Sequence, residues 1–128
     1  MVIDTSALIA ILVDEPERRA FIEKIEAADT RLLSAANLVE ASIVMEVRYG
    51  AEGGKFLDLF VERAGIEIVP VDVEQAREAR LADSHYGKGR HAARLNFGDC
   101  FAYALAIMSG EPLLFKGTDF SSTDVVPA

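Results

Sequence analysis

The stretch that decides the fold is MVIDTSALIAIL, residues 1–12. The apolar run from Met1 to Asp4 predicts a buried strand, and the apolar run after it predicts a helix over Ser6 to Val13. Asp4 ends the strand and precedes a Thr5-Ser6 pair. Because Asp, Thr and Ser side chains commonly cap helices, Asp4 is either a cap or a group with a chemical role. The choice depends on whether other acids of the chain lie near it.

The rest of the chain alternates helices and strands. Helices are predicted over Pro16–Ala28, Ala36–Tyr49 closed by Gly50, Glu52–Ala64, Glu74–Tyr86 and Asp99–Ser109. Strands are predicted over Arg31–Ser34, Ile66–Val71, Leu113–Phe115 and, at the end, Val125-Val126. Strands separated by helices need crossover connections and therefore pair in parallel. The expected fold class is α/β, a three-layer fold with a mostly parallel central sheet of about five short strands flanked by helices.

Composition favours one domain, residues 1–128, because a chain of 128 residues with 51% hydrophobic content can bury one core. The formal charge of −8 and the pI near 4.7 argue against broad nonspecific nucleic-acid binding, which needs a basic surface. The lone Cys100 forms no internal disulfide and the N-terminus resembles no leader, so we expect a cytoplasmic protein. No apolar run approaches the roughly 18 residues of a membrane span.

Two aspartates are expected at one edge of the sheet. Ligands of open parallel sheets bind beyond the C-terminal ends of the strands. Asp4 ends the first strand, and Asp119 follows the LLF strand within KGTDF. If these two strands are neighbours, both carboxylates emerge at the same edge. Taken alone, Asp119 is also explained as a turn or cap residue, and Asp99 as an acid favoured in the first turn of a helix.

Glu40 is the most informative acid. In NLVEASIVMEV, residues 37–47, helical periodicity predicts a stripe made of Glu40 and four apolar residues, Ala36, Ile43, Val44 and Val47. We expect this stripe to face the core, where an uncompensated carboxylate is costly. No lysine or arginine shares the stripe. Glu40 therefore needs a partner elsewhere, either an ion pair with another segment or a bound cation.

A shared divalent cation would account for four acids at once, namely Asp4, Glu40, Asp99 and Asp119. Carboxylates supply the hard oxygen ligands that suit Mg²⁺ or Mn²⁺. A zinc site is not expected, because Cys100, His85 and His91 match no usual ligand spacing. The acids together predict a cation site at the sheet edge.

Four segments occur together along the chain, VIDTSALIAIL, NLVEASIVM, LNFGDCFAYALA and LLFKGTDFSSTDV. In this order and with this spacing, from Met1 almost to the C-terminus, they resemble the PIN-domain ribonucleases of the VapC toxin type. The resemblance implies a PIN-like fold with a parallel sheet between helices. It also implies an endoribonuclease that hydrolyses RNA phosphodiester bonds with Mg²⁺ or Mn²⁺, as the toxin of a type II toxin-antitoxin system.

By the same resemblance, the family's catalytic quartet of acids corresponds to Asp4, Glu40, Asp99 and Asp119. It implies Asp4 and Asp99 as direct metal ligands, Glu40 as a ligand or the base that orients water, and Asp119 as a ligand through water. Thr5 or Ser6 would be the family's hydroxyl, which caps the helix and helps to hold a metal-bound water. The family also implies a homodimer that a cognate VapB-type antitoxin silences.

The segment HYGKGRHAARLNFG, residues 85–98, is the candidate RNA contact. Between Asp83 and Asp99 it contains no acid, while Lys88, Arg90 and Arg94 supply positive charge. We expect it near the site because Asp99 ends it. The alternatives are a solvated loop, or a salt bridge from Arg94 to the carboxylates.

Two other classes of function share these features. A phosphoacceptor receiver domain has a similar length, a parallel sheet and Mg²⁺, and Lys116 after the LLF strand imitates its lysine. A receiver needs an acid pair near its first strand and an acceptor on a central strand, for which Asp72 is the only candidate here. The third class is a noncatalytic protein-binding module on the same fold, against which the presence of all four acids argues.

Overall fold

A parallel sheet of four strands forms the centre of the computed structural model, which describes residues 1–128. The strands are β1 (Val2–Ile3), β2 (Leu32–Ser34), β3 (Glu67–Val69) and β4 (Leu113–Leu114). Their spatial order is β3-β2-β1-β4, so β1 pairs in parallel with both β2 and β4. The predicted parallel sheet is confirmed, and its first strand lies in the interior of the sheet.

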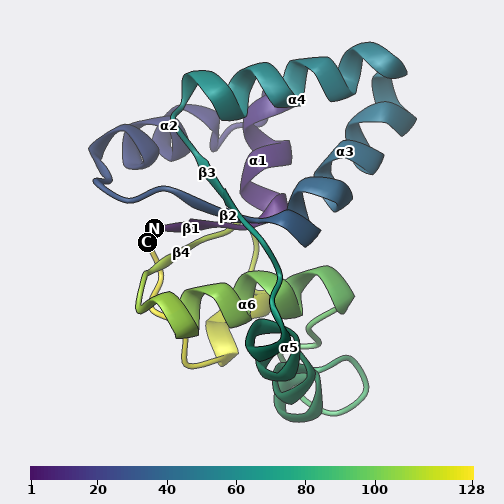
Figure 1. The fold of residues 1–128 in the computed structure, drawn as a ribbon, viewed down its shortest axis with the longest axis vertical. Coiled ribbons are helices and arrows are strands. Elements are labelled where there is room, and N and C mark those ends of the chain that lie inside the picture. Colours follow the sequence, from purple (N-terminus) through teal and green to yellow (C-terminus); the bar gives the residue numbers. More distant parts are fainter.

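Helices cover both faces of this sheet. They are α1 (Thr5–Leu12), α2 (Arg18–Ala27), α3 (Ala35–Tyr49), α4 (Ala51–Arg63), α5 (Val73–Tyr86), α6 (Phe97–Ser109) and the short 3-10 helix η1 (Asp119–Ser122). Figure 1 shows α1 to α4 on one side of the strands and α5 and α6 on the other. Successive strand residues point to opposite faces. Ile3 accordingly belongs to the core under α1 to α4, and its neighbour Val2 to the core under α5 and α6. The three-layer α/β prediction is confirmed.

The helix ends predicted from the sequence differ from the observed ends by at most two residues. The largest difference that matters for the site is at α6, which begins at Phe97 and not at Asp99, because Asn96 caps it. Gly50 ends α3 as predicted, with a φ of 70° that favours glycine. None of the helices is both long and apolar enough to cross a membrane.

The predicted last strand at Val125-Val126 is wrong, and the sheet has four strands instead of about five. The tail makes only an isolated parallel bridge between Pro127 and Leu113. The two hydrogen bonds of this bridge both use the backbone of Leu113. Because β4 is only two residues long, it offers no further groups with which the tail can pair.

The predicted buried face of α3 is also wrong. Its buried residues are Asn37, Ala41 and Met45. Three apolar residues of the predicted stripe are exposed instead, Ile43 with 57%, Val44 with 39% and Val47 with 83% of their surface, and Ala36 is half-buried. Periodicity identifies which residues share a face, whereas packing against α1, α4 and α6 decides which face is covered. Glu40 consequently lies half-buried beside an exposed apolar stripe and not within the core.

Candidate functional site

The site is built at the C-terminal ends of β1 and β4, which are adjacent in the sheet. Asp4 follows β1 directly, and its backbone N–H donates to the Leu114 carbonyl of β4 at 2.9 Å. The chain that leaves β4 reaches Asp119 at the exposed start of η1. The expectation that these two strands are neighbours is therefore confirmed, and it carries both aspartates to one edge of the sheet.

Asp4 is a helix cap whose carboxylate keeps one oxygen without a partner. Its Oδ2 accepts hydrogen bonds from the Ser6 backbone N–H at 2.9 Å and from the Ser6 hydroxyl at 2.6 Å. Its Oδ1 is buried and accepts none. Burial raises the pKa of Asp4 above its ordinary value, although the hydrogen bonds from Ser6 oppose this. Capping and a chemical role are thus compatible, because they use different oxygens.

The structure separates the two hydroxyls that follow Asp4. The hydroxyl of Ser6 donates to Asp4 and accepts a hydrogen bond from the Lys116 backbone N–H at 2.9 Å. Ser6 therefore links the first aspartate to the segment that leads to Asp119. The Thr5 hydroxyl donates instead to the Asn37 carbonyl at 3.4 Å. Asp4 caps α1, and neither the Thr5 nor the Ser6 hydroxyl does. The expectation that one of these two hydroxyls caps the helix is therefore wrong.

Asp99 lies in the first turn of α6 within a capping box. Its Oδ2 accepts from the Asn96 backbone N–H at 3.0 Å, and the Asn96 side chain accepts from the Asp99 N–H at 2.9 Å. The pKa of Asp99 is raised from 3.8 to about 7, mainly by burial and also by the charges of Asp4, Asp119 and Glu40, while the hydrogen bond from Asn96 lowers it. Asp4, Glu40 and Asp119 therefore lie close enough to Asp99 for their charges to affect the ionisation of its carboxylate.

Glu40 reaches this group from α3 by packing against the start of α6. A Cβ added to Gly98 would lie 1.9 Å from the Glu40 Oε2 atom, so any larger residue at position 98 would displace the Glu40 carboxylate. The Asn37 side-chain amide lies 3.5 Å from the Glu40 Oε1 atom and donates to the Gly98 carbonyl at 3.0 Å. Neither Asn37 nor Gly98 is identified from the sequence as part of the site. A glycine in the first turn of a helix, where it is unfavourable, is a signal that could have indicated this contact.

The donor set suits a hard divalent cation. As they stand, no three carboxylate, histidine or cysteine side chains lie close enough together to hold a metal ion. Binding would require side chains to move toward one another. The buried, unpartnered Oδ1 of Asp4 and the like charges around Asp99 nevertheless fit an oxygen-ligated Mg²⁺ or Mn²⁺, which would neutralise them.

The basic segment forms a loop closed at its base by a bridge between Gly87 and Leu95. Lys88, Arg90 and Arg94 are all exposed on it. Arg90 lies 3.7 Å from Asp83, whereas Lys88 and Arg94 take part in no ion pair. The alternative of a salt bridge from Arg94 to the acids is therefore not realised, and RNA contact stays a prediction.

The residues that a receiver domain would use are badly placed for that function. Asp72 follows β3, which is an edge strand separated from β1 by β2. Its carboxylate caps α5 by accepting from the Gln75 N–H at 2.8 Å. The Lys116 ammonium pairs with Glu15 and Glu17. The geometry thus disfavours phosphoacceptor chemistry.

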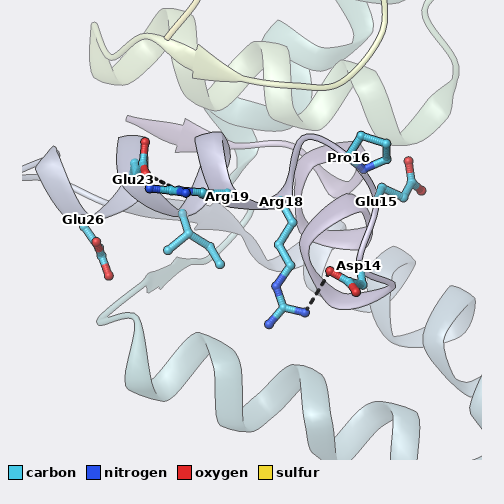
Figure 2. A pocket seen from close by; sticks show the side chains of 8 residues that line it. Asp14, Glu15, Pro16, Arg18, Arg19, Glu23 and Glu26 are labelled. Atoms are coloured by element: carbon cyan, nitrogen blue, oxygen red, sulfur yellow. Dashed lines mark hydrogen bonds and ion pairs between the residues drawn. The ribbon is translucent and has the colours of Figure 1, made fainter.

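The largest pocket lies elsewhere, between the end of α1 and α2. It has a volume of about 610 Å³, and Figure 2 shows its charged lining. Both of its arginines are already paired, Arg18 with Asp14 at 3.6 Å and Arg19 with Glu23 at 2.9 Å. A smaller pocket of about 270 Å³ is lined by Glu40, Gly98, Phe97 and Phe101 among others. Of these two pockets, the smaller one adjoins the acids.

The comparisons with known proteins identify the family of this chain. The family model described as PIN domain matches residues 1–126. The chain belongs to the PIN domain family. Ribonuclease VapC30 of Mycobacterium tuberculosis is 54% identical over 125 residues, which cover 98% of this chain and 95% of that protein. This PIN domain is therefore of the VapC type.

Solved PIN-domain structures share the fold at low sequence identity. The crystal structure of Mycobacterium tuberculosis VapC20, a Sarcin-Ricin loop cleaving toxin, covers 99% of this PIN domain and 97% of that chain, with a TM-score of 0.79 and 17% identity. The VapBC2 complex of Rickettsia felis, bound to a promoter DNA fragment, aligns with a TM-score of 0.76 and 15% identity over 98% of this chain and 94% of that one. These likenesses support the fold.

Proposed function

We propose that this protein is a Mg²⁺- or Mn²⁺-dependent endoribonuclease and the toxin of a type II toxin-antitoxin system. The observation that carries the proposal is the Oδ1 atom of Asp4, which is buried without a partner at the sheet edge where the charges of Asp4, Asp119 and Glu40 help to raise the pKa of Asp99. The names of the relatives support ribonuclease activity, since the 54% identical protein is called a ribonuclease. Because Oδ2 of Asp4 accepts the hydrogen bonds from Ser6 and Oδ1 accepts none, Oδ1 is available as a metal ligand.

In the proposed mechanism, the position of each acidic side chain determines its role. Asp4 and Asp99 would hold the cation directly, because each uses one oxygen for a helix cap and leaves the other free of hydrogen bonds. When bound, a divalent cation makes water more acidic and neutralises the charge that builds on the phosphate. Glu40 is a further ligand, or accepts the proton of the attacking water. Asp119, exposed at the rim, would hold the cation through water.

In this proposal the basic segment, residues 85–98, holds the RNA strand beside the acids. Lys88 and Arg94 are exposed cations without ion-pair partners in a chain of net charge −8. They would contact phosphates, which fixes the position of the strand without reading its sequence. Ser6 holds Asp4 in place during the reaction, while the Thr5 hydroxyl supports the Asn37 backbone instead.

The deciding experiment is RNA cleavage by purified, antitoxin-free protein. A pool of cellular RNA would be incubated with Mg²⁺ or Mn²⁺, with EDTA as one control, and the new RNA ends mapped. Asp4→Asn removes the ligand charge, whereas Asp72→Asn makes the same change at the cap of α5, outside the site. We expect discrete metal-dependent cuts with the wild type and Asp72→Asn, and none with Asp4→Asn. Equal cleavage by both variants would contradict the proposal.

We further propose two protein partners, a second copy of the chain and a VapB-type antitoxin. Both follow from the VapC resemblance, and the solved VapBC2 complex of Rickettsia felis supports a partner of this class. A surface that suits the homodimer is the exposed stripe of α3, made of Val39, Ile43, Val44 and Val47. An antitoxin that carries a basic side chain to the acids would neutralise their excess charge. We also propose that the protein acts in the cytoplasm, because its proposed substrate is RNA.

The oligomeric state tests the homodimer. Replacing Ile43 and Val47 by lysine places two charges on the stripe, and we expect the mass measured by light scattering to fall from dimer to monomer. Val126→Lys is the matched control, because Val126 is 67% exposed on the tail. A wild-type protein that is monomeric at high micromolar concentration would contradict the homodimer.

A further inference from the structure

Asn37 is a polar residue buried in a position where an apolar one would be expected. It is 0% exposed on the inner face of α3, in line with Ala41 and Met45. Its side-chain Oδ1 is buried and accepts no hydrogen bond. Leaving a buried acceptor unpaired destabilises a fold, and an apolar side chain of the same size would avoid this cost. Stability alone therefore gives no reason for asparagine here.

The contacts of Asn37 all lead to residues beside the acids. Its side-chain N–H group donates to the Gly98 carbonyl at 3.0 Å and lies 3.5 Å from the Glu40 Oε1 atom. Its own carbonyl accepts from the Thr5 hydroxyl at 3.4 Å. Asn37 thus joins the starts of α1, α3 and α6, and these three elements carry Asp4, Glu40 and Asp99.

The contact between α3 and α6 leaves little freedom. Glu40 packs on the bare Cα of Gly98, and the same Gly98 carries the carbonyl that Asn37 holds. The amide therefore fixes both sides of the contact at once, namely the backbone turn that precedes Asp99 and the carboxylate that approaches it. A side chain at position 37 without an N–H donor would hold neither the Gly98 carbonyl nor the Glu40 carboxylate.

We propose that Asn37 is a positioning residue, whose side-chain amide holds Glu40 and the Gly98–Asp99 turn in the register in which their carboxylates can share one divalent cation. The inference rests on the proposed function and adds a residue that touches neither substrate nor cation. It also explains why an unpaired buried oxygen is tolerated, since functional sites commonly retain groups that reduce stability.

The test compares Mn²⁺ affinity with thermal stability in Asn37→Leu, which keeps the approximate volume and removes every polar atom. We expect a dissociation constant for Mn²⁺, measured by calorimetry, about ten-fold or more above that of the wild type, as is typical when a group that orients a ligand is removed. The melting temperature should stay equal or rise. Asn37→Ala provides a smaller replacement, with the same expected loss of affinity.

Met45→Leu is the matched control, because Met45 is fully buried two turns along the same face and is not part of the site. It should leave the Mn²⁺ affinity unchanged. At saturating Mn²⁺, Asn37→Leu should lower kcat for RNA cleavage and leave KM for RNA unchanged. If folded Asn37→Leu and Asn37→Ala bind Mn²⁺ as tightly as the wild type, the positioning role is overturned and the proposed function stands. If the wild type itself binds no Mn²⁺, both are overturned.

Discussion

The carboxylate of Glu40 lies so close to Gly98 that a Cβ on Gly98 would stand 1.9 Å from Oε2. This contact joins α3 to α6 and brings Glu40 beside Asp99, whose pKa the charge of Glu40 helps to raise. The glycine before the aspartate is thus part of the site, because it leaves room for another helix's acid.

The first prediction concerns Gly98→Ala. The added methyl group should displace Glu40 and reduce RNA cleavage by at least ten-fold, with a parallel loss of Mn²⁺ affinity by calorimetry. Gly54→Ala is the matched control, because its Cβ would also meet a glutamate, Glu46 Oε1 at 2.8 Å, but that side chain is exposed and can move away. The control should keep full activity and gain about 0.5–1 kcal/mol of stability from a better helix residue. Full activity of Gly98→Ala would contradict a role for this close contact between Glu40 and Gly98.

The second prediction is a fall in stability as the pH rises. The pKa of Asp99 is about 7 in the folded protein against an ordinary 3.8, so between these values the folded state binds its proton more tightly than the unfolded state does. The contribution of Asp99 is therefore largest below about pH 4 and disappears as the pH rises through 7. Since one pKa unit corresponds to about 1.4 kcal/mol, its upper limit is roughly 4 kcal/mol.

Urea denaturation of metal-free protein from pH 5 to pH 8 measures this slope. Asp99→Asn should flatten it, and saturating Mn²⁺ should raise the stability most at pH 8, where the carboxylate is ionised. A slope that is the same in wild type and Asp99→Asn would contradict the assignment of the raised pKa to this residue.

The third prediction concerns Ser6→Ala. The substitution removes the hydroxyl that donates to Asp4 Oδ2 and accepts from the Lys116 N–H, so we expect a loss of about 1–3 kcal/mol in the free energy of unfolding and a clear loss of cleavage. Ser42→Ala is the control, because its hydroxyl bonds only the Leu38 carbonyl of its own helix. Denaturation curves and cleavage rates for the two variants should differ. If they do not, Ser6 is not needed to hold Asp4.

The fourth prediction concerns RNA binding by the basic loop. Replacing Lys88 and Arg94 by alanine should weaken binding of single-stranded RNA and reduce the salt dependence of the binding constant by about 0.7 for each phosphate that is no longer neutralised. Mn²⁺ affinity should not change. Lys55→Ala with Arg77→Ala removes two exposed cations from α4 and α5 as a control, and should leave RNA binding as it is. Equal salt slopes in the two double variants would remove the loop from the RNA-binding surface.

Much of the fold and the identity of the acids follow from the sequence. Alternating apolar runs predict the parallel sheet, and local periodicity with caps places the helix ends within two residues of those observed. Asp4 and Asp119 are found because parallel neighbouring strands end at the same edge, a rule that needs only strand direction and order. These features depend on local chain geometry, which a sequence encodes directly.

Only the tertiary structure decided what surrounds the acids. Periodicity grouped Glu40 with Ile43 and Val47 but placed that stripe in the core, whereas the packing of α3 covers the line of Asn37, Ala41 and Met45. The choice of Ser6 over Thr5, the donor role of Asn37 and the need for glycine at position 98 arise where α1, α3 and α6 meet. Contacts between segments distant in the chain depend on how helices pack across the sheet, and no local pattern specifies that.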